Sequence, residues 1–153
     1  MDSKVRLVPA QFRHINRIAN NLREIDGIEC RSTGRTPKDA LREAFFSSKQ
    51  AWTALVDGRP EAMFGVVVTS VLTGEGVPWF LGTEEVYRHG RELIMWGPGI
   101  IERLHNSRLR LANVVCSRNE QAIKLLRKWG FTVSEDEIEM GGEMFHLFEK
   151  EPV

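Results

Sequence analysis

Few residues of this chain have the types and spacing that metal, nucleophilic or acid–base chemistry requires. The two cysteines, Cys30 and Cys116, form neither a metal-binding spacing nor a disulfide framework. Nothing in the sequence pairs a histidine with a nucleophile; the four histidines are His14, His89, His105 and His146. We therefore predict no metal site, and the catalytic residues remain unknown from residue types alone.

Charge is distributed unevenly along the chain, although 21 Lys and Arg balance 21 Asp and Glu. Residues 88–128 carry nine Lys or Arg against three acids, whereas residues 134–151 carry seven acids against one Lys. Either these segments form solvated faces whose opposite charges cancel, or the basic segment faces an anion such as a phosphorylated cofactor. The neutral whole disfavours general nucleic-acid binding, for which a domain pI above about 9 is typical.

One glycine pattern, Ile94-x-x-Gly97-x-Gly99, has the spacing of a phosphate-binding loop. It lies far beyond the nearest predicted strand, so the strand–turn–helix context that such a loop needs is missing. Pro98 has no N–H and costs a helix interior about 3 kcal/mol or more. We therefore predict a break or sharp kink between Trp96 and Ile100, with Trp96 as an exposed aromatic anchor for protein contacts.

Hydrophobic periodicity predicts the elements that must position these residues. Strands are predicted at 5–8, 51–56, 62–72, 77–81, 111–116, 131–140 and 143–148, and helices at 11–23, 37–48, 83–108 and 119–129. Residues 26–35 contain two glycines and are predicted to form a loop. The order β-α-α-β-β-β-α-β-α-β-β predicts an α/β fold, in which helices flank a mixed, mostly antiparallel sheet.

The length of 153 residues suits a single domain spanning 1–153. The longest nearly apolar run, Ala62 to Val68, is too short to cross a bilayer. No apolar segment follows Met1 to Lys4, so we expect no signal peptide and no membrane partner.

The segment Asn119-Glu-Gln-Ala-Ile-Lys-Leu-Leu-Arg-Lys-Trp-Gly130-Phe131 resembles the signature helix of the GCN5-related N-acyltransferase (GNAT) superfamily, N-x-x-A-I-x-L-Y-x-K-x-G-F. The element order resembles that fold over nearly the whole chain. Within it, residues 79–95 and the hairpin 57–65 resemble the internal virion (core) protein A family of short-tailed phages. That resemblance implies a GNAT-like protein of virion assembly or DNA delivery.

The GNAT resemblance implies a cofactor site for acyl-CoA, which we assign to Leu81, Thr83, Arg88, Arg91 and Asn119. The family's phosphate-binding loop, Q/R-x-x-G-x-G/A, is not present after residue 81, where Glu84 and Glu85 stand instead. The family's acid, the Tyr of the signature helix, corresponds to Leu126, and the only tyrosine is Tyr87. The Glu that commonly serves as base on the fourth strand has no counterpart within 77–81.

Two functions from different classes follow from this pattern. The first is a phage protein with eroded acyltransferase motifs and no expected cofactor, which contacts other virion proteins of the internal core, portal or tail and not nucleic acid. The alternative is an active acetyl-CoA-dependent N-acetyltransferase with a rearranged phosphate loop; a CoA-binding regulator is a third reading. The first function places the chain in the virion or in the cytoplasm of the infected bacterial host.

Overall fold

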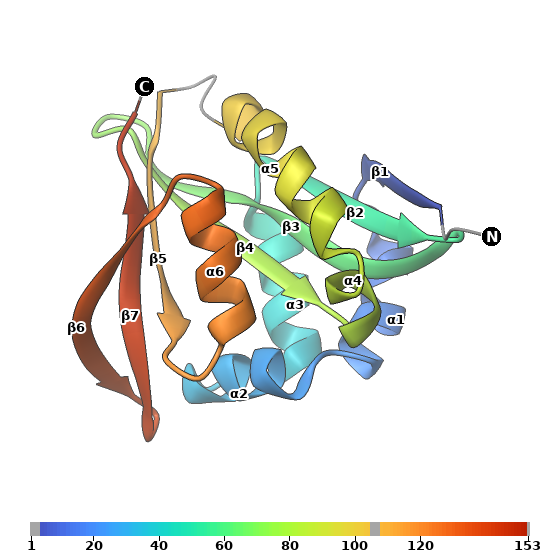
Figure 1. Ribbon diagram of the computed structural model, residues 1–153, viewed down its shortest axis with the longest axis horizontal. Coiled ribbons are helices and arrows are strands. Elements are labelled where there is room, and N and C mark those ends of the chain that lie inside the picture. Colours follow the sequence, from blue (N-terminus) through green and yellow to red (C-terminus); the bar gives the residue numbers. More distant parts are fainter. Residues whose placement is uncertain (1–3, 105–107, 153) are drawn as a thin grey trace.

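The computed structural model, described over residues 4–104 and 108–152, contains one sheet of seven strands in the order β1-β2-β3-β4-β5-β7-β6 (Figure 1). The strands are β1 (Val5–Pro9), β2 (Gln50–Val56), β3 (Arg59–Ser70), β4 (Glu75–Gly82), β5 (Arg110–Cys116), β6 (Thr132–Met140) and β7 (Glu143–Lys150). The helices are α1 (Ile15–Asn20), α2 (Glu24–Ser32), α3 (Pro37–Ser47), α4 (Glu84–Tyr87), α5 (Gly90–Leu104) and α6 (Glu120–Lys128), with a 3-10 turn, η1 (Phe12–His14), before α1. The predicted mixed α/β architecture is confirmed.

Helices cover both faces of the sheet. In Figure 1, α4, α5 and α6 lie in front of it, and α1 and α3 lie behind it. Successive side chains of β3 point to opposite faces of the sheet and contribute to the core on each side. Met63 packs with side chains of α1 and α3, whereas its neighbour Phe64 packs with those of α5. Each large apolar side chain buried in this way stabilises the fold by about 1.5–3 kcal/mol.

Caps and tight turns formed by neighbouring residues join these elements. Asp57 and Gly58 both have positive φ, at 51° and 83°, and connect β2 to β3 as a tight hairpin. The Thr36 side chain accepts a hydrogen bond from the backbone N–H of Asp39 and caps α3. At the end of α6, Gly130 has a φ of 94°, a conformation that favours glycine.

The predicted loop at 26–35 is wrong, because residues 24–32 form α2. Helix propensity at Gly27 is poor, but long-range polar contacts hold the segment in place. The side chains of Arg23, Asp26 and Glu29 recur every three residues and bond β4, β5 and α6. Tertiary contacts therefore override the local preference for a loop.

The predicted break between Trp96 and Ile100 is wrong, because α5 continues through Pro98 and the helical region breaks instead at 88–89; the sharp kink that was the alternative stays a prediction. Gly97 explains why the proline is tolerated. A Cβ on Gly97 would lie 2.0 Å from the Trp129 indole, so the glycine lets the two helices pack together closely. The Trp129 indole N–H also donates to the Leu93 carbonyl at 2.9 Å. These contacts offset the hydrogen bond that Pro98 cannot make.

Candidate ligand-binding groove

The central strands β4 and β5 separate after a short stretch of parallel pairing. Only Glu75 with Arg110 and Gly76 with Leu111 are paired. Pro78 follows on β4, and its carbonyl accepts a hydrogen bond from the Asn113 side chain of β5 at 2.8 Å. In a strand, the N–H and the C=O of one residue point toward the same neighbouring strand. Since the carbonyl of Pro78 faces β5, the N–H that proline lacks would also have faced β5. The proline therefore ends the ladder at the point where the strands diverge.

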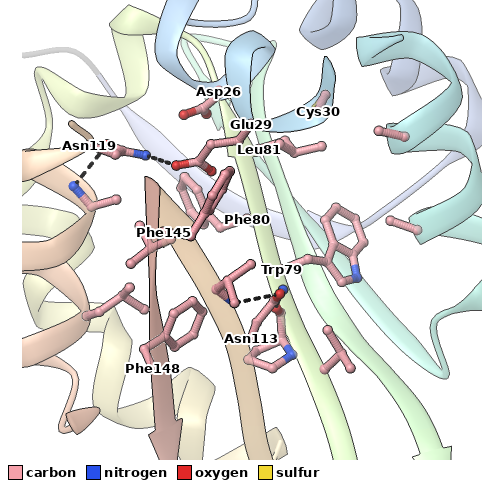
Figure 2. Close-up of a pocket in the computed structure, with 18 of the residues that line it drawn as sticks. Asp26, Glu29, Cys30, Trp79, Phe80, Leu81, Asn113, Asn119, Phe145 and Phe148 are labelled. Atoms are coloured by element: carbon pink, nitrogen blue, oxygen red, sulfur yellow. Dashed lines mark hydrogen bonds between the residues drawn. The ribbon is translucent and has the colours of Figure 1, made fainter. Parts of the chain in front are cut away.

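A cavity of about 310 Å³ occupies the opening between the two strands (Figure 2). Its walls come from β4, β5, α2, α3, α6 and β7, and most of them are apolar. The larger apolar side chains on the walls are Trp79, Phe80, Leu81, Leu125, Leu126, Trp129, Phe145 and Phe148. Polar groups enter from α2 and the start of α6, from the connection between α2 and α3, and from β5; they are Asp26, Glu29, Thr33, Arg35, Asn113 and Asn119.

Side chains of the chain itself bind the strand edges that face this cavity. Asp26 Oδ2 accepts the backbone N–H of Gly82 at 2.9 Å, at the end of β4. Glu29 Oε1 accepts the backbone N–H of Cys116 at 3.1 Å, at the end of β5. Asn113 accepts the backbone N–H of Val114 at 2.8 Å and donates to β4 as described above. Several peptide groups along the groove are therefore already satisfied.

Arg23 joins α2 to α6 beneath the rim of the groove. Its Nη2 donates to Asp26 at 2.9 Å and to Asn119 at 3.0 Å, and its Nη1 donates to Gln121 at 2.8 Å. The guanidinium also lies 3.6 Å from the centre of the Tyr87 ring. Since Arg23 is 4% exposed, these contacts form a buried network that fixes the position of α2.

Burial changes the pKa of the Glu29 carboxyl, which lies on the wall of the cavity. Its Oε1 also accepts the Asn119 side-chain N–H at 2.9 Å, as Figure 2 shows. Burial raises the pKa of Glu29 to about 7, and the negative charge of Asp26 adds to this, whereas the hydrogen bond from Asn119 opposes it. Burial likewise raises the pKa of Asp26, against the lowering effect of Arg23. Glu29 therefore changes protonation near neutral pH.

Tyr87 and Leu126 line the same cavity, although they come from α4 and α6. The structure thus places the only tyrosine on the wall of the same cavity as the position where the resemblance expects one. Burial raises the pKa of Tyr87, and the charge of Asp26 raises it further. The phenol consequently stays protonated and lies against Arg23.

The five residues expected to bind a cofactor do not gather at one place. Leu81 and Asn119 line the cavity, and Asn119 also caps α6 by accepting the backbone N–H of Ala122 at 3.4 Å. Thr83 is buried and donates to Glu61 at 2.6 Å. Arg88, which follows α4, and Arg91 on α5 are exposed and do not line the cavity. Cofactor contact at these five positions remains a prediction.

The junction after β4 does not fit a CoA diphosphate. The N–H of Gly82 is bound by the Asp26 carboxylate, and Glu84 and Glu85 form the first turn of α4. Carboxylates at this position repel a diphosphate. Gly97 and Gly99 offer no replacement loop, because both lie inside α5. An acyl-CoA would therefore meet three carboxyl groups where the family holds its phosphates.

Other expected functional residues have structural roles. Trp96 is partly buried against the core, so its prediction as an exposed anchor is wrong; the exposed apolar side chains of α5 are Ile94 and Met95. Cys116 is fully buried, as expected for a small apolar group. His14 is buried against Thr53, whereas His105 lies outside the described residues.

The sequence interpretation missed Arg23, Asp26 and Glu29. Their spacing of three residues puts them on one side of a helix, and that pattern was the available signal. It could not be used because residues 26–35 were expected to form a loop. The error in one element therefore hid the main polar cluster of the groove.

No helix of the described part of the chain is long and apolar enough to span a membrane. No protein-family model matches the sequence, and no curated protein matches it. The resemblance to phage internal virion proteins therefore receives no support from these comparisons.

Solved structures, by contrast, match along nearly the whole chain. Ard1 from Thermoplasma volcanium matches with a TM-score of 0.73 and 12% identity, covering 97% of this chain and 98% of its own. A GNAT-family acetyltransferase from Streptococcus pneumoniae gives 0.62 and 15%, covering 97% and 99%. Spermidine N-acetyltransferase from Vibrio cholerae, solved with CoA and spermine, gives 0.63 and 13%, covering 97% and 95%. At these identities the likeness establishes the fold, and the chain has the GNAT-like α/β fold.

Proposed function

We propose that this chain is a GNAT-fold virion protein that acts through contacts with other proteins and not through acyl transfer. One observation carries the proposal: the Asp26 carboxylate binds the Gly82 N–H, at the junction where the fold's acyl-CoA relatives hold phosphate. The site is thus filled by an anion of the chain itself. A diphosphate would have to displace a carboxylate that is also paired with Arg23 at 2.9 Å.

The catalytic groups support the same conclusion. Leu126 stands where the family's signature helix has its acid, and it has no proton to give. Tyr87 lies in the cavity, but its ring is covered by the Arg23 guanidinium. The groove therefore keeps the shape of a cofactor site while its phosphate end and its usual acid are altered.

The virion setting comes from the resemblance of residues 79–95 and 57–65 to internal virion proteins. Those segments form the β2–β3 turn with the first part of β3, the second half of β4, α4 and the start of α5. Of these, the end of β4 and Tyr87 of α4 line the cavity. A protein with this role requires surfaces for partners and no turnover. We accordingly expect it in assembled particles or in the cytoplasm of the infected host.

Calorimetry with acetyl-CoA and CoA tests the absence of a cofactor. We expect a dissociation constant weaker than about 10 μM, which corresponds to roughly −7 kcal/mol. The double variant Glu84→Gln, Glu85→Gln removes two charges at the junction, so any residual affinity should increase in it. Tight binding by the unmodified chain would overturn the proposal.

Complementation of a phage that lacks this gene tests the role itself. We expect the chain in purified particles by gel electrophoresis, and full plaque counts with the Glu29→Gln variant, because that change removes a groove carboxyl whose pKa is about 7 while glutamine keeps the shape of the side chain. Loss of infectivity with Glu29→Gln in a normally composed particle would favour chemistry over assembly.

N-acyl transfer is the second candidate, and the cavity with Glu29 favours it. The relatives solved with CoA share the fold, and a carboxyl with a pKa of about 7 is suited to accept a proton from an amine. An acetyl-transfer assay with a panel of amines tests this candidate. Turnover that falls at least about 100-fold in Glu29→Gln would establish it.

A further inference from the structure

Three phenylalanine rings cluster on the outer side of η1 and α3. The Phe12 ring lies 5.7 Å from Phe46 and 6.5 Å from Phe45, and Phe45 and Phe46 are 5.1 Å apart. Phe12 is 55% exposed and Phe46 is 66% exposed. A gathering of exposed aromatic rings is typical of a surface that binds a partner.

Cations accompany these rings. Arg42 lies one helical turn before Phe46 on α3, with its guanidinium 5.8 Å from the Phe12 ring, and Lys38 lies one turn earlier. Arg13 follows Phe12 directly. None of the three cations forms an ion pair within the described residues. We call this surface the basic aromatic patch; it consists of Phe12, Arg13, Lys38, Arg42, Phe45 and Phe46.

A surface of the opposite charge lies on β6, which is the strand at one edge of the sheet. Four acids on this strand are exposed, and Ile138 between them is 48% exposed. We call them the acidic strip; it consists of Glu135, Asp136, Glu137, Ile138 and Glu139. Among the described residues, only Glu137 has a cationic neighbour, His146 at 3.9 Å. Because side chains alternate along a strand, Ile138 points to the face opposite Glu137 and Glu139, so this edge strand offers exposed negative charge on one face and an exposed apolar side chain on the other.

The two surfaces cannot meet within one molecule. The patch lies on helices that pack against β3, and β4, β5 and β7 separate β3 from β6. At about 4.8 Å per strand this is roughly 20 Å or more. Figure 1 places β6 at one side of the sheet and α1 toward the other.

We propose that the basic aromatic patch of one copy binds the acidic strip of a second copy of this chain. The two surfaces are complementary in both charge and apolar character. Because they are different surfaces, the contact is head-to-tail, and repetition closes a ring or extends a chain of copies. This self-association goes beyond the proposed function and does not depend on whether the groove binds a cofactor.

A polyanion is the competing partner for the patch, and the charge of the chain disfavours it. The whole chain is neutral, whereas nucleic-acid-binding domains are usually strongly basic. A short acidic and apolar strand fits the patch better than a phosphate backbone does.

Sedimentation velocity of the full chain tests the proposal, at low and at high ionic strength. We expect concentration-dependent association that weakens in high salt, because exposed charges are screened. Arg42→Glu in the patch and Glu139→Arg in the strip should each weaken association by about tenfold or more. Arg127→Glu, an equal charge change on the exposed side of α6, is the matched control and should leave association unchanged.

Mixing the two variants gives the decisive measurement. Each variant alone keeps one intact surface, so an equimolar mixture of Arg42→Glu and Glu139→Arg should form dimers that neither forms alone. Circular dichroism of each variant shows that it is folded. A chain that remains monomeric at low salt and high concentration would overturn the proposal. So would association that survives both variants, or a patch that binds only a DNA oligonucleotide.

Discussion

Replacing Glu29 by Gln should change how the stability of the chain depends on pH. The ordinary pKa of this carboxyl is 4.5, and burial raises it to about 7 in the folded chain. The folded state therefore favours the protonated form. Its stabilising contribution is complete below pH 4.5, is lost as the pH rises toward 7, and stays lost above that. At 1.36 kcal/mol per pKa unit, the loss is about 3 kcal/mol.

Glutamine has the shape of the protonated carboxyl and keeps an oxygen that can accept from Asn119 and Cys116. Glu29→Gln and the unmodified chain should therefore have similar free energies of unfolding at pH 5, whereas at pH 8 the variant should be more stable by up to about 3 kcal/mol. Urea unfolding at both pH values measures this difference. Comparison of the two chains at each pH cancels the titration of all other groups.

Glu24→Gln is the matched control, because Glu24 lies exposed on the same helix. It should leave the pH dependence unchanged. The reasoning is refuted if Glu29→Gln and the unmodified chain lose equal stability between pH 5 and pH 8, since the carboxyl would then titrate as it does in the unfolded chain.

Two further changes test the packing of α5 and α6. Gly97→Ala would place a Cβ within 2.0 Å of the Trp129 indole and should lower the free energy of unfolding by about 1–3 kcal/mol or more, whereas Gly99→Ala meets no atom within 4 Å and should raise it by up to about 1 kcal/mol. Equal melting temperatures for the two variants would contradict the close helix contact. Leu125→Ala should cost about 2–5 kcal/mol, and Arg127→Ala almost nothing; coincident thermal melts would show that the buried face of α6 is misassigned.

Local signals predicted most of the fold. Asp57 and Gly58 marked the hairpin that sets the register of β2 and β3, and Asn119 and Gly130 marked the two ends of α6. These features depend on neighbouring residues alone. The order of the strands and the place of most helices therefore followed from the sequence, together with the mixed sheet.

The features that the sequence did not predict depend on contacts between distant residues. Arg23 bonds Asn119 across 96 positions, and Asp26 bonds Gly82 across 56. The continuity of α5 through Pro98 likewise depends on Trp129, which belongs to another helix. Helix propensity contains no information on such partners, so α2 and its polar cluster, which form one wall of the groove, were missed.

The hydrogen bond from Asn113 to Pro78 has a consequence for how the protein responds to small molecules. In a groove whose strand edges await a ligand, binding completes the sheet, and the melting temperature rises with ligand concentration by mass action. Here Asn113, Glu29 and Asp26 already bind those edges. The strand edges along the groove are therefore satisfied in the folded chain without a ligand, and the fold does not depend on one to complete them.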